Sequence, residues 1–552
     1  MAQSRVWVPW DILYHRHPDG VSSLETAFVS RKLLKSTAVT GSMTLLSRIT
    51  GLIRDIFFAS LIGAGSGVAA DAFYVAFRIP NFLRRIFGEG AFSQSFVPVF
   101  AEYKTKYTAD EAKAFVDHMA GILGLILFSI TFVGVLAAPV LVMVLAPGFL
   151  DDPQKYDLTV QMLRITFPYI FFISLVAMAA GVLNTYGHFG APAFTPVLLN
   201  LSLIGAAAWL APRMEDPVVA LAWGVFIAGV VQLLFQIPFL RGIRMLPRPR
   251  LRLRERHQGV SRVFKLMLPA IFGVSVAQIN MLVNTLLASF LITGSVSWLY
   301  YSDRLMEFPL GVFGIALATV ILPSLARRHA NSAQEEFSHL LDWSLRWVFL
   351  IAIPATVALI ILSGPMLVTF FYFGAFTAHD VRMSANALMA FSFGLLGFIL
   401  IKVLAPGFYA RQDTKTPMRI GALSMGVNIV LSLLLVMPLK HVGLALAISL
   451  AAFVNAGVLY LMLRRQDVYL PSPGWVSFLS RVFLASAVMG AALFWGMGDI
   501  DSWLQAPALE RAMRLSILVI AGGLVYLLTA AAFGVRLAQL LLKKGEGAKV
   551  DD

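Results

Sequence analysis

The chain has 552 residues, of which 58% are hydrophobic and 13% are charged, and its mean hydropathy is +0.78. A soluble domain carries about 25% charged residues, so this composition excludes an ordinary soluble protein. The sequence contains no cysteine, which excludes disulfides, thiolate metal sites and cysteine nucleophiles. A net charge of +14 would suit nucleic-acid binding, but the distribution of that charge along the chain argues against such a partner.

Residues 1–30 have neither a long apolar core nor a cleavage-type ending, so they do not resemble a signal peptide. We expect a poorly ordered cytoplasmic extension there. Fourteen apolar stretches follow, each about as long as the ~20 residues that a helix needs to cross a ~30 Å hydrocarbon core. They cover approximately 37–62, 72–100, 117–147, 160–186, 191–211, 217–240, 264–292, 297–325, 341–371, 384–409, 418–438, 441–463, 475–497 and 513–537. The prediction is an all-α polytopic membrane protein with 14 transmembrane helices.

Basic residues gather at alternate ends of these stretches. If the N-terminus is inside, the even-numbered stretches end in the cytoplasm, and those ends carry Lys104, Lys106, Arg241 through Arg256, Arg327, Arg328, Arg411, Lys415, Arg419, Arg464, Arg465, Lys543 and Lys544. The opposite loops, such as GAGSGVA and TGSVS, are short and poor in base. The positive-inside rule therefore predicts a protein of the cytoplasmic (inner) membrane with both termini in the cytoplasm.

The sequence also contains a weak internal repeat. FSQSFVPVFAEYK (92–104) resembles LATVILPSLARRH (317–329), with Pro98 over Pro323, and the same offset places Pro192 over Pro417. Six stretches separate each pair, which favours two pseudo-symmetric six-helix bundles in the same orientation. Chance similarity between apolar helix ends is the alternative. The expected units are a first bundle with its basic loop, a second bundle, two C-terminal helices and a cytoplasmic tail, at 31–262, 263–466, 467–541 and 542–552.

The first stretch contains LLSRITGLIRDIFFAS (45–60), in which Arg48, Arg54 and Asp55 interrupt an apolar helix. A charged side chain at a bilayer centre costs roughly 2.5–3.5 kcal/mol on insertion scales, whereas Leu, Ile or Phe returns only ~0.3–0.6 kcal/mol. Arg48 and Asp55 are seven residues apart and so share a helix face. These side chains should therefore face something polar rather than lipid.

Charged residues recur in the second stretch and in its counterpart in the second half of the chain. The second stretch carries Asp71, Arg78 and Arg85 every seven residues, with Arg84 and Glu89 beside them, and Pro80 is expected to bend the helix. The counterpart, YYSDRLMEFPLGVFG (300–314), places Arg304 between Asp303 and Glu307.

Two interpretations of these charges remain open. The acids are compatible with buried ion pairs that hold helices together. The arginines exceed the acids in the first two stretches, and intramembrane ionisable residues usually face a watery cavity along a substrate path. Because guanidinium groups bind phosphate bidentately, the excess favours an anionic, phosphorylated ligand. Lys402 is either a further cavity cation or a side chain that snorkels to the cytoplasmic surface.

Other classes of site find little support. Asp151 and Asp152 precede Pro153 and are typical of a turn, and the histidines show no ligand spacing, so we predict no metal site. Gly63, Gly65 and Gly67 are not followed by GK[ST], which argues against a phosphate-binding loop. No clustered acid–histidine set indicates a glycosyltransferase or a lipid phosphatase, so we expect a transporter and not an enzyme.

Three long segments resemble the MurJ (MviN) family of lipid II flippases, in the multidrug/oligosaccharidyl-lipid/polysaccharide exporter superfamily. They are DAFYVAFRIPNFLRRIFGEGAFSQSFVPVFAEYK (71–104), SVSWLYYSDRLMEFPLGVFGIALATVILPSL (295–325) and VLAPGFYARQDTKTP (403–417). The resemblance runs from about residue 33 to the end. It implies two bundles around a cationic cavity, a hydrophobic groove formed with the last two helices, and movement of the undecaprenyl-pyrophosphate-linked peptidoglycan precursor between leaflets.

The resemblance also implies roles for individual residues. It matches the substrate-binding arginines to Arg48, Arg54, Arg84 and Arg304, and the gate or cavity acids to Asp55, Asp71 and Glu89. Arg85, Asp303, Glu307 and Lys402 are further cavity candidates. The expected partners are lipid II, membrane lipid and the cell-wall synthesis machinery, the expected state is a monomer, and no cofactor is expected. The coupling cation or membrane potential stays open, because the Na⁺ site of some relatives has no clear counterpart.

Alternatives in other classes are an exporter of another polyprenyl-linked oligosaccharide, a drug antiporter, and a receptor or scaffold for lipid-linked precursors. An antiporter for cationic drugs would need cavity acids, whereas this chain is rich in arginine. A receptor would bind lipid II without changing its leaflet.

Overall fold

The computed structural model describes residues 23–65, 67–250, 257–330 and 333–535. Within these ranges the chain forms helices and no β-strand. Nine helices or helix pairs are long and apolar enough to cross a membrane, counted over the described residues. The expected extension at 1–30 lies outside the described residues up to position 22, whereas 23–30 belong to the first helix. The expected tail at 542–552 lies outside them altogether.

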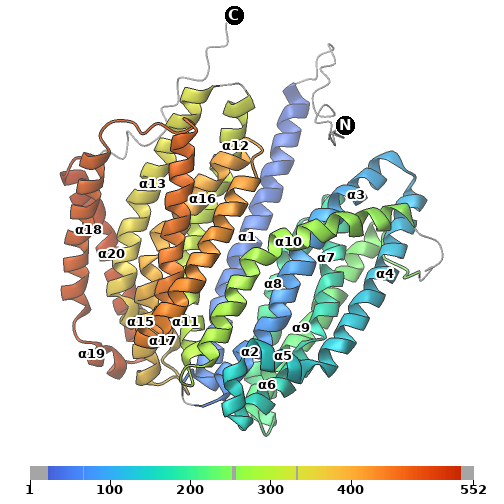
Figure 1. Cartoon of the computed structure of the whole chain (residues 1–552), viewed down its shortest axis with the longest axis horizontal. Coiled ribbons are helices and arrows are strands. Elements are labelled where there is room, and N and C mark those ends of the chain that lie inside the picture. The colour runs from blue at the N-terminus through green and yellow to red at the C-terminus, as the bar shows by residue number, and fades with distance from the viewer. Residues whose placement is uncertain (1–22, 66, 251–256, 331–332, 536–552) are drawn as a thin grey trace, which may run out of the picture.

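The first part of the chain forms one group of helices, coloured blue to green in Figure 1. Apart from α1, its helices pack around α7 and α9. The bounds are α1 Ser23–Ile62, α2 Ala69–Leu83, η2 Arg84–Phe92, α3 Ser93–Lys106, α4 Ala109–Leu136, α5 Ala138–Leu145, η3 Pro147–Asp151, α6 Pro153–Thr166, α7 Tyr169–Thr185, α8 Gly190–Gly205, η4 Ala206–Leu210, η5 Ala211–Arg213 and α9 Pro217–Gly242. We call α2–α9 the N-terminal group.

The second part begins with α10, which lies beside the N-terminal group, and its other helices form a group coloured yellow-green to red on the other side of α1 in Figure 1. The bounds are α10 Gln258–Ser289, α11 Ser295–Pro309, η6 Leu310–Gly314, α12 Ile315–Ala330, α13 Gln334–Ile361, α14 Ser363–Phe371, α15 Ala378–Phe393, α16 Leu395–Tyr409, α17 Lys415–Arg465, α18 Trp475–Met497, α19 Ile500–Gln505 and α20 Ala508–Ala532. We call α11–α17 the C-terminal group; α18 and α20 pack together on its flank, against α13 and α14.

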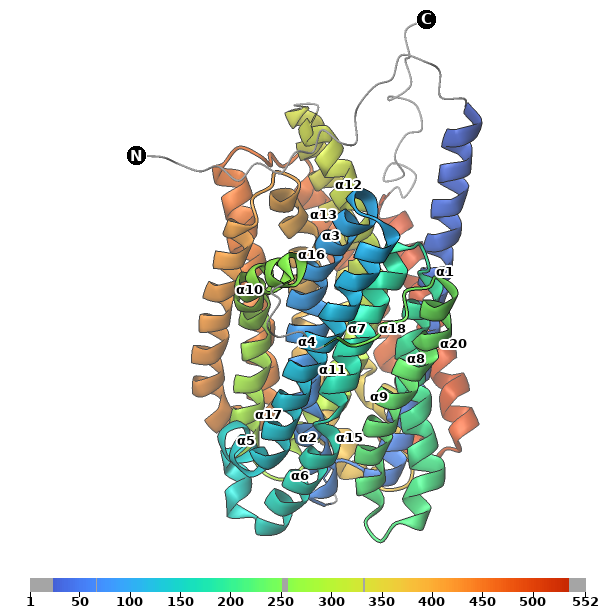
Figure 2. The ribbon, with the colours of Figure 1, turned by 90° about the vertical axis from the view of Figure 1, so that its right-hand side faces the viewer.

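Two helices connect the groups. Helix α1 packs against α8 of the N-terminal group and against α14 of the C-terminal group. Helix α10 packs against η2 and α3 on one side and against α17 on the other. Figures 1 and 2 place α5 and α6 at one end of the helices and the beginning of α1 with α12 at the opposite end. We refer to these as the α6 end and the α12 end.

Helix α2 continues through Pro80 and then widens into the π-helix η2 before α3. The succession α11, η6, α12 repeats this order in the second half of the chain. Each π-segment contains two glycines, at 88 and 90 and at 311 and 314, which weaken regular α-helix formation. Because π-segments are frequent at functional sites, the two widened turns are candidates for positions that face a ligand.

The apolar stretches expected at 418–438 and 441–463 form one continuous element, α17. Lys440 interrupts its helical backbone with φ 51° and ψ −132°, so α17 is two helices that meet at this residue. Pro438 explains the position of the break, since proline removes a backbone donor from the helix.

Candidate functional site

A cavity of about 890 Å³ lies between the two groups of helices. Its polar and charged lining residues are Thr44, Ser47, Arg48, Arg84, Tyr169, Thr195, Asn200, Gln232, Gln236, Arg304, Glu307 and Lys402. Four of these are cations and one is an acid, so the described wall has an excess of positive charge. Side chains of α13, α14 and α20, among them Leu359, Phe370 and Leu515, form an apolar side of the same cavity.

Two of the cavity arginines, one on the connecting helix α1 and one on α11 of the C-terminal group, lie close to glycines across the junction. Arg48, on α1, lies with its guanidinium group over Gly311 of η6. Arg304, on α11, places Nη2 2.8 Å from the position that a Cβ atom on Gly51 would occupy. A side chain at either glycine would displace the arginine that lies over it. The two glycines therefore make room for two cations at the junction of the groups.

Asp55 is the buried centre of the charge network beside this cavity. Its carboxylate is fully buried and accepts hydrogen bonds from Arg304 Nε at 2.7 Å and from the Tyr300 hydroxyl at 2.9 Å. Arg54 donates to the same carboxylate from Nε at 3.0 Å and from Nη2 at 2.6 Å. Asp55 therefore connects Arg54, its neighbour in the sequence, to Arg304 of the C-terminal group.

Arg54, which is expected to bind substrate, lies buried beside the cavity, and its role in binding stays a prediction. It is only 6% exposed and is not among the described residues that line the cavity. Each of its nitrogens donates a hydrogen bond, because Nη1 bonds to Asn200 Oδ1 and Nη2 to the Tyr300 hydroxyl, both at 3.0 Å, in addition to the Asp55 bonds. In this conformation Arg54 positions Asp55 and, through it, Arg304.

Asp71 connects the two groups at the α6 end. This buried carboxylate accepts hydrogen bonds from Lys155 Nζ at 3.0 Å, from the Gly294 amide at 2.8 Å, and from both the amide and the hydroxyl of Ser297, at 3.0 and 2.6 Å. Gly294 and Ser297 stand at the beginning of α11, where the helix dipole favours a negative charge.

A second carboxylate makes the reciprocal connection. Asp380, at the beginning of α15, accepts hydrogen bonds from the Gly65 amide at 2.7 Å and from Trp298 Nε1 at 2.8 Å. Nearby, the Ala375 amide donates to the Ser60 carbonyl at 3.0 Å. We call these contacts of Asp71, Asp380 and Ser60 the α6-end latch.

The remaining candidates lie in several environments. Arg84 lines the cavity and donates from Nε and Nη2 to Asn81 Oδ1, at 3.0 and 2.8 Å. Lys402 is exposed and lines the cavity, and Glu307 lines it at 3.3 Å from Arg304 Nη1. Arg85 is exposed and Asp303 is half-buried, and neither is among the described lining residues. The side chain of Glu89 lies outside the described residues.

Sequence reasoning missed the neutral polar residues of the site. Gln232 and Gln236, on α9, are buried, and their amides donate to the carbonyl and the hydroxyl of Thr195 at 2.9 and 3.1 Å. Their four-residue spacing in an otherwise apolar stretch was an available signal. Lys155, Asp380 and Ser297 of the α6-end latch were also missed. Asp380 forms a capping box with Thr377, which predicts a helix start but not the contact with Gly65.

The chemistry of the cavity suits binding rather than bond cleavage. Among the described residues, no group of three or more His, Asp or Glu is placed to hold a metal ion. Guanidinium groups and an excess of positive charge are chemically suited to bind a phosphate or a pyrophosphate. The apolar side of the cavity suits a ligand that also has a hydrophobic part.

Comparison with known proteins gives concordant results. A family model described as "Lipid II flippase MurJ" matches residues 58–533. The chain is 46% identical over 519 residues to "Probable lipid II flippase MurJ" of Vibrio cholerae serotype O1, covering 93% of this chain and 98% of that protein. It is 46% identical over 501 residues to "Lipid II flippase MurJ" of Burkholderia cenocepacia, covering 90% and 96%.

Solved structures agree with this. The structure described as "Lipid II flippase MurJ, inward closed conformation" matches with a TM-score of 0.77 and 26% identity, over 91% of this chain and 100% of that one. An inward-facing multidrug resistance MATE family transporter of the MOP superfamily matches with a TM-score of 0.65 and 17% identity, over 78% and 98%. The second likeness concerns the fold alone.

Proposed function

The chain belongs to the MurJ family of lipid II flippases, a family of multi-pass inner-membrane transporters, and from this premise we propose that it moves lipid II from the inner to the outer leaflet by alternating access. The observation that carries the proposal is the cavity between the two groups of helices, with Arg48, Arg84, Arg304 and Lys402 in its wall and Glu307 as the acid among its described residues.

The cations address the main energetic obstacle to moving lipid II. A pyrophosphate headgroup loses strong interactions with water when it enters the membrane, and this desolvation is costly unless the charge is paired and hydrogen-bonded. In the proposed bound state, Arg48 and Arg304 hold the pyrophosphate and Arg84 lies nearer the mouth. The substrate competes with Glu307 for Arg304 Nη1, whereas Asp55 retains Arg304 Nε and keeps the guanidinium in place.

The proposed topology has fourteen transmembrane helices with both termini in the cytoplasm. The helices form two six-helix bundles, at 31–262 and 263–466, and a last pair at 467–541 that contains α18 and α20. In this orientation the α6 end is periplasmic and the α12 end is cytoplasmic. The α6-end latch then belongs to a state that receives substrate from the inside, and the latch must open before release.

The same proposal includes the path of the lipid chain, the driving force and the state of assembly. The polyprenyl chain stays in the bilayer or along the groove formed with α18 and α20, while the sugars and peptide occupy the hydrated cavity. A membrane potential or a coupling cation drives the return of the carrier. The protein acts as a monomer and associates with the cell-wall synthesis machinery.

The test is depletion of this protein in cells, with measurement of the lipid II that an external cleaving toxin can reach. Wild-type protein supplied in trans should restore toxin-accessible lipid II. Arg304→Ala should remain in the membrane but fail to restore it, whereas the control Arg382→Ala, which changes an exposed arginine of α15, should behave as wild type.

Two outcomes would count against the proposal. Toxin-accessible lipid II that is the same with and without the protein would reject the flippase function and favour a receptor that binds lipid II in one leaflet. Full restoration by Arg304→Ala would remove Arg304 from the substrate site.

A further inference from the structure

A second pocket lies away from the cationic cavity, beside the first turns of α18. It has a volume of about 1030 Å³ and is formed by α13, α16, α17, the 469–474 linker and α18. We call it the α18 groove. Its lining residues are Leu345, Phe349, Leu400, Leu404, Phe453, Ala456, Gly457, Tyr460, Tyr469, Pro471, Ser472, Pro473, Gly474, Trp475, Val476, Ser477, Leu479 and Ser480.

Helix α16 separates the α18 groove from the cationic cavity. Leu400 and Leu404 line the groove, whereas Lys402, two residues from each, lines the cavity. Residues two apart on a helix point to nearly opposite sides, so the two sites lie on opposite faces of α16. A ligand in the α18 groove therefore does not reach the arginines of the cavity.

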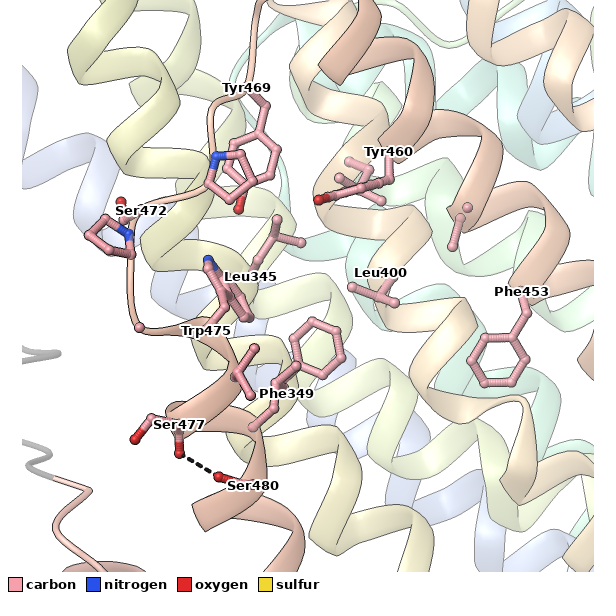
Figure 3. Close-up of a pocket in the computed structure, with 18 residues that line it drawn as sticks. Leu345, Phe349, Leu400, Phe453, Tyr460, Tyr469, Ser472, Trp475, Ser477 and Ser480 are labelled. Atoms are coloured by element: carbon pink, nitrogen blue, oxygen red, sulfur yellow. Dashed lines mark hydrogen bonds between the residues drawn. The ribbon is translucent and has the colours of Figure 1, made fainter.

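The groove is apolar between the helices and has polar side chains beside the linker, at what we call its polar end. Figure 3 shows Phe349, Leu345 and Leu400 between the helices, with Tyr460 and Tyr469 toward the linker. Trp and Tyr side chains are enriched where a membrane meets water. This arrangement fits an amphiphile whose chain lies among the helices and whose head lies beside the linker.

The polar end is held in place by Asp342 of α13. Its carboxylate accepts hydrogen bonds from the Tyr469 hydroxyl at 2.8 Å, the Ser472 amide at 3.1 Å and Trp475 Nε1 at 2.7 Å. Arg346 Nε also donates to Asp342, at 2.9 Å. Because its oxygens are already engaged, Asp342 does not present a free negative charge to the groove, and the linker and Trp475 are fixed in advance of ligand binding.

Positive charge lies just beyond the polar end. Arg464 and Arg465 are exposed in the last turn of α17. Arg464 lies four and seven residues after Tyr460 and Gly457, so it is on the helix face that lines the groove. Asp467 follows them in the sequence, so two arginines and one acid stand between Tyr460 and the 469–474 linker.

We propose that the α18 groove binds an anionic phospholipid of the surrounding leaflet, with an acyl chain along Leu345, Phe349 and Leu400 and its phosphate toward Arg464 and Arg465. The bound lipid connects α18 to α13, α16 and α17 as a structural component and is not the transported molecule. This inference does not depend on the proposed flippase function.

Gly457 provides a direct way to fill the groove. A Cβ atom at this exposed position would meet nothing within 4 Å, so Gly457→Leu adds a side chain in the groove without a clash. Gly426 is a matched control, since it is also exposed on α17 and a Cβ atom there would also meet nothing within 4 Å. Gly426→Leu has the same effect on helix propensity but lies outside the groove lining.

The experiment is native mass spectrometry of the delipidated full-length protein with phosphatidylglycerol or phosphatidylethanolamine of identical acyl chains. Wild type should retain the anionic lipid in preference to the zwitterionic one. Arg464→Gln and Arg465→Gln should each weaken that retention by about fivefold, the effect of one basic residue near a membrane surface. Gly457→Leu should lose retention of both lipids, and Gly426→Leu should match wild type.

Equal retention of the two lipids by wild type would overturn the proposal without the need for any variant. Retention by Gly457→Leu equal to that of wild type would also overturn it. Undecaprenyl phosphate serves as a competitor: its displacement of phosphatidylglycerol at equimolar concentration would assign the groove to the chain of the transported lipid instead.

Discussion

At the residue scale, the defining feature is that one buried acid serves two arginines. Asp55 bonds to Arg54 and Arg304, and Tyr300 joins the same carboxylate. Removing one partner of a buried ion pair leaves an uncompensated charge, which is much more destabilising than the net contribution of the pair itself. Asp55 should therefore matter for the integrity of the fold as well as for the position of Arg304.

We predict that Asp55→Asn lowers the free energy of unfolding by about 3–5 kcal/mol, because it leaves Arg54 buried without its counter-charge. The measurement is denaturant unfolding of the protein in detergent. Asp157→Asn, at an exposed position on α6, is the control and should change the midpoint little. Equal midpoints for Asp55→Asn and wild type would show that Arg54 finds another partner.

A second prediction concerns the room left by Gly311. The change Gly311→Ala places a methyl group where the Arg48 guanidinium lies, so it should reduce lipid II transport severalfold while the protein stays folded. Gly314→Ala lies in the same π-segment, and there an added Cβ comes no closer than 3.3 Å to its neighbours. Both changes should raise helix propensity alike. The rate at which lipid II becomes accessible outside should fall for position 311 only.

The family resemblance named Arg48, Arg84 and Arg304 and left Lys402 open between the cavity and the cytoplasmic surface, and the structure places all four on one cavity. Their cost in a bilayer was enough to predict a polar neighbour. This energetic cost did not distinguish the cavity residues from Arg54, because an arginine buried among polar partners avoids lipid as well as one that lines a cavity. Only the contacts of Arg54 with Asn200 and Tyr300, far away in the sequence, separate a residue that positions Asp55 from one that lines the cavity.

At the element scale, the beginning of α10 combines a helix start with a cluster of rings. His257 precedes the helix, and its ring lies 5.2 Å from that of His118, 5.6 Å from Phe115 and 5.7 Å from Tyr103. Burial, and then the nearby His118, lower the pKa of His257 below its usual value of 6.5. This site lies where α10 leaves the N-terminal group.

The lowered pKa predicts that stability falls on acidification. Below about pH 6.5 the unfolded chain binds a proton at His257 that the folded protein resists, so the stabilisation is complete above that pH and decreases as the pH falls toward the folded pKa. The melting temperature of wild type should therefore drop between pH 7 and pH 5. His257→Asn should show a smaller drop, and an identical drop would assign the effect to other groups.

Hydropathy predicted an all-helical membrane protein, and the described residues contain nine helices or helix pairs long and apolar enough to cross a membrane, whereas the count of fourteen stays a prediction. The break expected between 438 and 441 coincides with Lys440 of α17. The π-segments could not be predicted, since no residue type specifies a π-turn and the glycines in them are compatible with several backbone conformations. The α6-end latch could not be predicted either, because some partners of Asp71 and Asp380 are backbone amides and the side-chain partners lie far away in the sequence.

At the scale of the whole molecule, the two groups of helices are joined at the α6 end by hydrogen bonds that any rocking motion must break. The backbone of Ser60, at the end of α1, and that of Ala375, before α15, approach to 3.0 Å there. The cysteine-free sequence makes it possible to introduce a cross-link at this point without removing native thiols.

We predict that the double change Ser60→Cys and Ala375→Cys can be cross-linked by an oxidant or a short bifunctional maleimide, and that the cross-linked protein no longer transports lipid II. Reduction of the oxidised form should restore transport. The single variants Ser60→Cys and Ala375→Cys, treated in the same way, should remain active. Full transport by the cross-linked protein would contradict a cycle that opens the α6 end.

The crosswise placement of Arg48 and Arg304 has a consequence for how cargo is unloaded. The Arg48 guanidinium lies over Gly311, which is close in the sequence to Arg304. The Arg304 guanidinium lies next to Gly51, which is close in the sequence to Arg48. In the proposed cycle, tilting of the halves separates both guanidinium groups from these glycines, and the paired contact with a pyrophosphate weakens as the cavity opens to the other side. The affinity for the pyrophosphate then depends on the conformation of the protein, and its release needs no separate event.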